Sequence, residues 1–240
     1  MGRTLRLILG DQLNSQHSWF GRIDPNVTYV MMEVLPETAY VTHHIQKVVG
    51  FFVAMRNFAS EMEKKGHQFI YFRLDDPHNR QSFEANVSDL LESGNFLRFE
   101  YLLPDEYRLD QLLSKFAARL SIPTAVYDTE HFMGTRDEVQ RFFKDRKTFV
   151  MEAFYRHIRT KYNLLMSDGK PLGGSWNFDV ENRKSLSQNV VVPTPPEFQH
   201  NVTGLVEMLN KMKVKTIGSI DAPKFPWPVS RKQSLEWLEF

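Results

Sequence analysis

The chain has 240 residues, of which 42% are hydrophobic and 25% charged, and its formal net charge is +1. This balance is typical of a soluble globular protein and excludes a disordered chain, and the apolar runs are far shorter than the roughly 20 residues of a membrane span. Because the total charge is near zero, any nucleic-acid-binding surface must be local. The absence of cysteine excludes disulfides, thiolate chemistry and Cys-ligated iron–sulfur or zinc sites.

The first part of the sequence predicts alternating strands and helices. Apolar runs predict strands at 4–10, 27–34, 68–73, 96–103 and 124–127, and apolar residues at helical spacing predict helices at 40–65, 82–92 and 107–120. Such alternation indicates an α/β fold with a doubly wound, five-stranded parallel sheet of Rossmann-like type, covered by helices on both faces. We assign this domain to residues 1–135.

The pattern changes after about residue 130. Helices are predicted at 136–145, 148–162, 202–212 and 231–240, with a glycine-rich polar stretch without strands at 167–187 and a proline-containing connector at 190–198. Residues 136–240 are therefore expected to form a small helical and linker segment. Because the last helical pattern continues to the end of the sequence, we expect the chain to be an excerpt of a longer protein.

Polar residues follow the first two predicted strands. Ligands of open α/β sheets bind beyond the carboxyl ends of the strands, where strand order reverses. The residues at these ends are Gly10, Asp11, Glu33, Glu37 and Tyr40. Gly10 lets backbone approach a ligand, and the carboxylates can accept hydrogen bonds from ring N–H groups or from ribityl and ribose hydroxyls. The alternative, that Asp11 and Glu37 only cap a turn and the long helix, fits their spacing equally well.

Signals for other chemistry are weak. No GxGxxG follows the first strand and no GxxxxGK[ST] occurs in the sequence. His43 and His44 are neighbours on the predicted helix and point about 100° apart, so they cannot hold one metal ion. We expect one of them to face solvent and the other to pack near the ligand mouth. The sequence predicts no metal site and no catalytic residue.

A basic stretch lies in the second part of the chain. Between residues 141 and 184, ten basic residues stand against five acidic ones, with aromatic residues interleaved. This composition is compatible with a surface that faces nucleic acid. The alternative is a solvated charged helix face above an aromatic core, and this alternative is the more common one.

Seven stretches together resemble one family. They are LILGDQL at 7–13, the second-strand exit at 33–41, LDDP at 74–77, MEAFYR at 151–156, GGSWNFD at 173–179, ENRK at 181–184 and WPV at 227–229. In this order they are similar to the deoxyribodipyrimidine photolyase-related proteins, the bacterial cryptochromes and (6-4) photolyases that carry an iron–sulfur cluster. The sequence departs from many relatives at IQK (45–47), where they have three lysines, at PDEYR (104–108), where they have a PGEWR-like string, and at Met32, where some have cysteine.

The resemblance implies a light-harvesting role for this chain. Family members bind the antenna 6,7-dimethyl-8-ribityllumazine in the N-terminal α/β domain, and bind FAD and a [4Fe–4S] cluster in a C-terminal domain that this sequence does not include. The antenna contacts correspond to Gly10, Asp11, Met32, Glu33, Glu37, Tyr40 and Phe51. Glu37 is expected to accept a hydrogen bond from the polar edge of the chromophore, and Tyr40 and Phe51 are expected to pack on its flat face.

The resemblance also implies partners for the chain. Full-length members use blue or near-ultraviolet light to repair or sense DNA lesions, so damaged DNA and the protein's own flavin domain are the expected partners. Asn182, Arg183 and Lys184 would face DNA, with Arg183 as the phosphate contact. We expect a cytoplasmic protein without a membrane segment. The rival hypotheses are a nucleotide-binding α/β enzyme domain and a chromophore-free DNA-binding module.

Overall fold

A computed structural model describes residues 2–187 and 189–239 of the chain. Contacts between residues divide it into two compact units. Unit 1 comprises Met1–Thr129 and Pro195–Phe240, and unit 2 comprises Glu130–Thr194. Unit 2 is therefore inserted into the sequence of unit 1. Among the described residues, no helix has the length and apolar character needed to cross a membrane.

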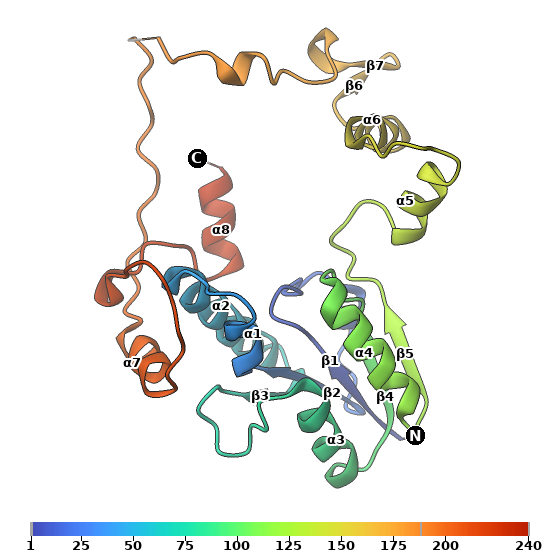
Figure 1. Cartoon of the computed structure of the whole chain (residues 1–240), viewed down its shortest axis with the longest axis vertical. Helices are drawn as coiled ribbons and strands as arrows, with labels where there is room; N and C mark the ends of the chain where they lie inside the picture. The colour runs from blue at the N-terminus through green and yellow to red at the C-terminus, as the bar shows by residue number, and fades with distance from the viewer. Residues whose placement is uncertain (1, 188, 240) are drawn as a thin grey trace. The chain divides into compact units, whose positions relative to one another are not determined.

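Unit 1 is built on one parallel sheet (Figure 1). Its strands are β1 (Arg3–Leu7), β2 (Val27–Met32), β3 (Gln68–Phe72), β4 (Phe96–Leu102) and β5 (Thr124–Tyr127), in the order β3-β2-β1-β4-β5. Every pairing in this sheet is parallel. The predicted α/β fold with a five-stranded parallel sheet is thus confirmed. Strand order reverses between β1 and β4, which places the expected ligand crevice at the carboxyl end of β1.

Helices cover both faces of the sheet and bury two separate cores (Figure 1). On one face, α3 (Phe83–Ser93) and α4 (Tyr107–Arg119) pack against side chains such as Leu5, Val30 and Phe99. On the other face, α2 (Ile45–Lys64) packs against Ile8, Tyr29 and Met31. Successive residues of a strand point to opposite faces of the sheet, so neighbouring side chains belong to different cores.

The helix predicted at 40–65 differs at its start. A short helix α1 (Leu35–Ala39) comes first, with Pro36 in its first turn, and α2 begins only at Ile45. His44 is the N-cap of α2, and its Nδ1 accepts a hydrogen bond from the backbone N–H of Gln46 at 3.2 Å. The paired histidines therefore precede the long helix instead of lying on it, because a side-chain cap fixes the helix start at residue 44.

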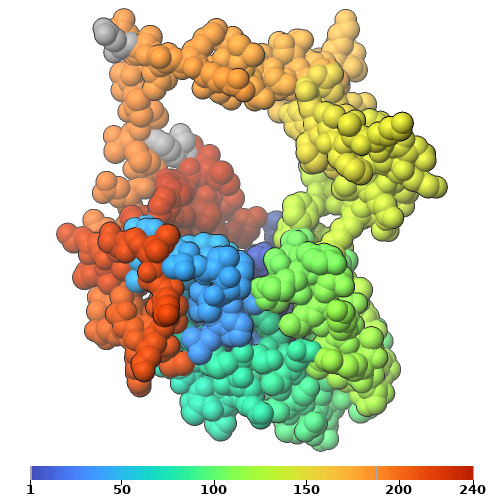
Figure 2. Space-filling view, in the orientation of Figure 1, coloured from blue at the N-terminus to red at the C-terminus, as the bar shows by residue number. Residues whose placement is uncertain are grey.

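The last segment of the chain packs on α2. It contains α7 (Thr203–Lys211), η4 (Ala222–Lys224) and α8 (Arg231–Leu238), while Phe240, the end of the predicted last helix, lies outside the described residues. Leu205, Leu209 and Phe225 belong to the same buried cluster as the apolar face of α2. A bridge between His44 and Ile217 joins the two segments, and Figure 2 shows the orange-red atoms lying against the blue ones.

Unit 2 contains two helices and a small hairpin. The helices are α5 (Arg136–Phe143) and α6 (Met151–Lys161), followed by the antiparallel pair β6 (Met166–Ser167) and β7 (Lys170–Pro171) and by the 3-10 turns η2 (Leu172–Gly174) and η3 (Glu181–Arg183). No strand was predicted here. The turn residues Asp168 and Gly169 both have positive φ, +50° and +73°, as the two-residue turns of hairpins require, so the Asp-Gly pair was the overlooked signal.

Candidate functional site

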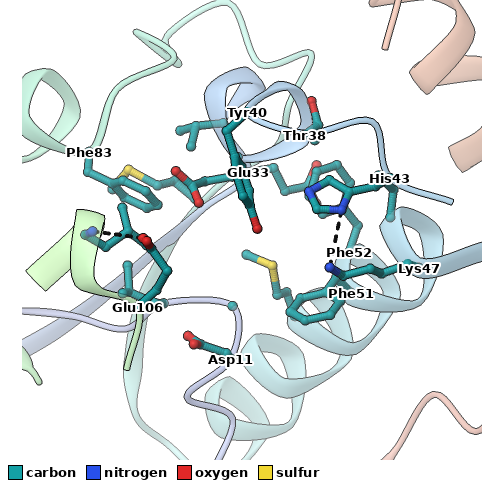
Figure 3. A pocket seen from close by; sticks show the side chains of 18 of the residues that line it. Asp11, Glu33, Thr38, Tyr40, His43, Lys47, Phe51, Phe52, Phe83 and Glu106 are labelled. Carbon is teal, nitrogen blue, oxygen red and sulfur yellow. Dashed lines mark hydrogen bonds between the residues drawn. The ribbon is translucent and has the colours of Figure 1, made fainter. Parts of the chain in front are cut away.

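A cavity of about 200 Å³ lies at the carboxyl edge of the sheet in unit 1 (Figure 3). Its walls come from the loops after β1 and β2, from α1 and α2, and from the start of α4. All seven residues predicted to contact an antenna line it, namely Gly10, Asp11, Met32, Glu33, Glu37, Tyr40 and Phe51. The topology therefore brings together residues that lie up to 41 positions apart in the sequence.

The loop after β1 is held in place by Gln12. The buried side chain of Gln12 accepts a hydrogen bond from the Leu9 backbone N–H at 2.9 Å and donates to the Leu103 carbonyl at 3.2 Å. Gly10 then passes close to α2, since a Cβ at this position would lie 2.8 Å from Sδ of Met55. A side chain at position 10 would therefore require Met55 to move.

Glu33 is fully buried and is bound by four protein donors. Arg56 donates to its two oxygens at 2.6 Å and 2.9 Å, the Tyr71 hydroxyl at 2.8 Å and the Leu74 backbone N–H at 2.9 Å. Burial raises the pKa of the Tyr71 phenol, which keeps it protonated as a donor. A carboxylate has about four acceptor directions. Glu33 therefore holds α2 against the end of β2.

Glu37 forms a bidentate ion pair with Arg108, which lies in the first turn of α4. Nη1 and Nη2 of Arg108 donate to the two carboxylate oxygens at 2.9 Å and 2.8 Å. The guanidinium carbon lies 4.8 Å from the centre of the Tyr40 ring. Hydrogen bonding to Glu37 raises the pKa of Arg108. This pair joins α1 to α4 across the mouth of the crevice.

The remaining guanidinium nitrogen, Nε of Arg108, has no hydrogen-bond partner among residues 2–187 and 189–239, although it is buried. The nearest carboxylate oxygen, Oε2 of Glu106, is 3.5 Å away. Glu106 is itself the N-cap of α4 and accepts from the backbone N–H groups of Arg108 and Leu109, each at 2.9 Å. Nε of Arg108 is therefore sealed inside the cavity wall, with the Glu106 carboxylate as its nearby counter-charge.

The opposite wall carries His43, Lys47 and Phe51 from α2 and the turn before it (Figure 3). His43 is buried and meets the Tyr40 ring edge-on at 5.1 Å, whereas His44 is exposed. This agrees with the prediction that one histidine faces solvent and the other the ligand mouth. Lys47 Nζ lies 3.3 Å from Nδ1 of His43. Figure 3 shows Tyr40 projecting into the space between this wall and Glu106.

The cavity combines aromatic walls with charged groups at its edge. Aromatic side chains of Tyr40, Phe51 and Phe83 supply apolar walls, and Glu37 with Arg108 supplies adjacent acceptor and donor groups. Within the part of the chain that the structure describes, no group of three or more His, Cys, Asp or Glu side chains is placed to hold a metal ion. The geometry thus supports binding and orientation.

Sequence reasoning missed several residues of the cavity. Arg108, Glu106, Lys47 and Phe83 line it although none was predicted as a contact. The signal for Arg108 was its place at the start of the helix after β4, because β4 stands next to β1 at the reversal of strand order. Glu106 caps the same helix and carries the same signal, whereas Lys47 and Phe83 lie within α2 and α3, where the pattern gives no comparable signal.

The three residues predicted to face DNA lie in unit 2. Asn182 and Arg183 are part of η3, and Lys184 follows it. Lys184 forms an exposed ion pair with Glu181 at 2.6 Å. Arg183 has neither an ion-pair nor a hydrogen-bond partner among the described residues. Arg183 is thus an exposed guanidinium available to an outside anion.

Arg159 joins the helix α6 to the loop that precedes η3. Its buried guanidinium donates to the carbonyl oxygens of Leu164 at 3.1 Å, Leu165 at 2.5 Å and Trp176 at 3.1 Å. Arg156 on the same helix lies over the Trp176 ring at 5.4 Å. The stretches 151–156 and 173–179, which are distant in sequence, are therefore packed together inside unit 2.

Comparison with known proteins agrees with the resemblance seen in the sequence. The family model described as deoxyribodipyrimidine photo-lyase-related protein matches residues 6–225. A (6-4) photolyase of Agrobacterium fabrum (strain C58) is 35% identical over 195 residues, which are 81% of this chain and 38% of that relative. An uncharacterized protein of Acanthamoeba polyphaga mimivirus is 22% identical over 157 residues, 64% of this chain and 78% of that relative.

The chain thus spans 38% of the length of the photolyase that it matches. The family model covers nearly all of the chain, including every element that forms the cavity. These matches, together with the parallel sheet and its order, show that the chain belongs to the deoxyribodipyrimidine photo-lyase-related protein family.

Proposed function

We propose that this chain is the antenna-binding part of a photolyase-related protein and holds 6,7-dimethyl-8-ribityllumazine in the cavity at the carboxyl edge of the sheet. The observation that carries the proposal is the convergence of all seven expected contact residues on one cavity with aromatic walls. When bound, the lumazine supplies absorption of near-ultraviolet and blue light and passes the excitation energy to a flavin.

The residues present fit such a ring. Arg108 is held by Glu37 and by the Tyr40 ring, so its guanidinium gives the cavity one charged edge. Glu37 would accept a hydrogen bond from a ring N–H, since each carboxylate oxygen retains an acceptor direction beside its bond from Arg108. Tyr40 and Phe51 would pack on the ring faces, and Asp11 would meet ribityl hydroxyls at the open side.

In this proposal the chain's own residues bind and orient and perform no acid, base or nucleophilic step. The flavin, as FAD, and the [4Fe–4S] cluster belong to the part of photolyase relatives that this chain does not span, and the chain has no cysteine to offer a cluster. The light-driven repair or sensing of DNA lesions is accordingly a property that we assign to the complete protein.

We extend the proposal to DNA contact by unit 2. Arg183 is exposed and unpaired within the described ranges, and Lys184 beside it is held only by an exposed partner, Glu181. Exposed ion pairs are weak, so a phosphate can replace Glu181 at little cost. Arg159 is buried and Arg156 is paired with Glu152 at 2.6 Å, so these two arginines of the basic stretch are less available to a phosphate than Arg183. We propose Arg183 as a phosphate contact.

The antenna proposal is tested by titrating the purified chain with 6,7-dimethyl-8-ribityllumazine and following its absorption and fluorescence. Wild type should bind with a shifted band, and Glu37→Ala should weaken binding by about tenfold or more, as expected for a charge-assisted hydrogen bond. The matched control is Glu84→Ala, because Glu84 also pairs with an arginine of α4, Arg119, but lies outside the cavity.

Two results would overturn the antenna proposal. One is the absence of lumazine binding by folded wild type. The other is equal binding by wild type and Glu37→Ala. Stoichiometric ATP binding that competes for the same site would instead support the nucleotide-binding enzyme hypothesis.

The DNA proposal is tested by measuring the affinity for duplex DNA at several salt concentrations. Removing one phosphate contact with Arg183→Ala should weaken binding at low salt and reduce the slope of log K against log salt by about 1. Lys232→Ala in α8 serves as the control, because Lys232 is an exposed lysine of unit 1. An unchanged slope for Arg183→Ala would contradict the assignment.

A further inference from the structure

A second cavity lies in unit 1, beyond the carboxyl end of β3, and has a volume of about 670 Å³. Its walls come from the middle of α2, from the residues that follow β3, and from the segment that leads into α7. Its titratable side chains are those of Arg56, Arg73, Asp75 and His200. Among the described residues, none lines both this cavity and the proposed antenna cavity of Figure 3. The second cavity is therefore a separate place at which a ligand can bind.

Arg56 lines the second cavity and is fixed from behind by Glu33. Its Nε and Nη2 donate to the two oxygens of Glu33 at 2.6 Å and 2.9 Å. The third nitrogen, Nη1, has no hydrogen-bond partner within residues 2–187 and 189–239, and it is not enclosed by protein, in contrast to Nε of Arg108. Because the buried carboxylate holds the planar fork, the N–H groups of Nη1 are already in position before a ligand arrives.

Arg73 supplies a second guanidinium to the same cavity. Its side chain is exposed and has no hydrogen-bond or ion-pair partner in the part of the chain that the structure describes. The backbone of this segment is fixed, since Asn79 Nδ2 donates to the Arg73 carbonyl at 2.9 Å and the N–H of Leu74 donates to Glu33 at 2.9 Å. Arg73 is thus a free cation on a backbone that is held in place.

Hydrogen-bond acceptors line the second cavity as well. The carboxylate of Asp75 is exposed and has no partner within the described ranges. Asn57 donates from Nδ2 to the Val229 carbonyl at 2.8 Å, and no described residue donates to its Oδ1. A carboxylate and an amide oxygen both accept hydrogen bonds from hydroxyl groups. The cavity therefore combines free donors with free acceptors.

The charges restrict the class of ligand that fits. The positive charges of Arg56 and Arg73 are balanced by the negative charges of Glu33 and Asp75, so no excess charge is present to hold a simple anion. Two guanidinium groups with free N–H groups match the several oxygens of a phosphate, and the acceptors match hydroxyl groups. A molecule that carries both groups satisfies both sets of residues, and the volume lies within the range of small-molecule sites, roughly 300–1,000 Å³.

We propose that the second cavity binds an organic phosphate that also carries hydroxyl groups, such as a sugar phosphate. Arg73 and Nη1 of Arg56 bind the phosphate oxygens, and Asp75 and Asn57 accept hydrogen bonds from the hydroxyls. This inference goes beyond the proposed function and does not rest on it, because the two cavities share no lining residue among those described. The backbone of nucleic acids offers similar chemistry, so duplex DNA is a necessary comparison.

Isothermal titration calorimetry with ribose 5-phosphate tests the site, and inorganic phosphate and ribose serve as the two halves of this probe. The variants are Arg73→Gln, which removes the free cation, and Asp75→Ala, which removes an acceptor. Both positions are exposed, and circular dichroism confirms that each variant is folded. Arg80→Gln is the matched control, because Arg80 is an exposed arginine of the same loop that pairs with Asp89 at 3.1 Å and does not line the cavity.

Wild type should bind ribose 5-phosphate about tenfold or more tightly than either half of the probe, because only the whole molecule uses both sets of residues. Arg73→Gln should weaken this binding about tenfold or more, as expected for the loss of a charge-assisted contact. Asp75→Ala should lower the preference for ribose 5-phosphate over inorganic phosphate, since inorganic phosphate does not need the acceptor. Arg80→Gln should bind like wild type, and Arg73→Gln should retain lumazine binding because Arg73 does not line the antenna cavity.

Three outcomes would overturn the inference. If folded wild type does not bind ribose 5-phosphate, the site is wrong, and the antenna proposal is unaffected. If Arg73→Gln and Arg80→Gln weaken binding equally, the effect is one of general charge and the cavity has no special role. If wild type binds duplex DNA but not ribose 5-phosphate, and Arg73→Gln weakens binding to DNA, Arg73 contacts a nucleic-acid backbone and the small-molecule site is wrong.

Discussion

Arg56 forms a bidentate ion pair with Glu33, in which Nε and Nη2 lie 2.6 Å and 2.9 Å from the two carboxylate oxygens. The side chain of Glu33 is fully buried, and that of Arg56 is 25% exposed. The pair links the middle of α2 to the exit of β2, and both segments contribute walls of the cavity.

Glu33→Gln should therefore destabilise unit 1. The substitution removes the charge that balances Arg56 and disturbs four hydrogen bonds, and partial exposure of Arg56 limits the loss to about 2–3 kcal/mol. Chemical denaturation followed by the fluorescence of Trp19, which is buried in the same unit, measures the change. The surface variant Glu84→Gln should change stability by less than about 0.5 kcal/mol. Equal effects of the two variants would contradict this reading of Glu33.

Two glycines of the last segment should respond to alanine in opposite directions. Gly218 has φ +76°, and a Cβ there would lie 1.8 Å from Nε2 of His44, the cap of α2, so Gly218→Ala should destabilise by about 1–3 kcal/mol. Gly204 lies in the first turn of α7, where a Cβ would have no described atom within 4 Å outside the adjacent residues and the backbone of the helix itself, so Gly204→Ala should stabilise by about 0.4–1 kcal/mol. Thermal unfolding of both variants measures their changes in stability. A change in the same direction for both variants would refute the prediction.

Lysine at position 159 should not be able to replace Arg159 in holding the loop of residues 164–178 against α6. A lysine ammonium cannot reach the carbonyls of Leu164, Leu165 and Trp176 together, because these bonds use the planar fork of the guanidinium. Arg159→Lys should therefore raise hydrogen exchange in residues 164–178 while residues 3–32 keep their protection. Arg141→Lys, at an exposed position of α5, is the control. Unchanged exchange in Arg159→Lys would disprove the anchoring role.

The packing of α5 on α6 should depend on pH through Glu138. Hydrogen bonds from Lys161 at 2.7 Å and His157 at 3.0 Å lower the pKa of Glu138 below its ordinary value of 4.5. Because the folded pKa lies below the unfolded one, the contact stabilises fully above about pH 4.5 and is lost as the pH falls through the folded pKa. Lys161→Gln should raise the pKa of Glu138, as NMR titration of its side chain would show. Lys170→Gln, a change in an exposed lysine, should leave it unchanged.

Much of the fold was predictable because its signals are local. The apolar runs of β1 and β2 and the helical spacing in α2 extend over enough residues to be recognised. Gly10, Asp11 and Glu37 were predictable as neighbours because parallel strands end at a common edge. The split between α1 and α2 was not, since it depends on the capping geometry of one histidine, His44.

The partners of the site residues could not be read from the sequence. The spacing of Glu33 and Glu37 gives no indication that Arg56 binds the first and Arg108 the second, because each arginine lies more than 20 positions away along the chain. Such pairs are set by tertiary packing of α2 and α4 against the sheet. The Asp168-Gly169 hairpin was a different case, since its signal was local and was overlooked.

The insertion of unit 2 between Thr129 and Pro195 has a consequence for how this protein can change. Unit 2 is connected at both of its ends to unit 1, so it can be replaced without changing the residues of the unit 1 core. An inserted segment costs unit 1 mainly the conformational entropy of closing a loop. The cavity and the exposed Arg183 lie in different units. On the proposals above, lumazine binding belongs to unit 1 and DNA contact to unit 2, so a chimaera that receives residues 130–194 of a relative should change its DNA affinity and keep its lumazine binding.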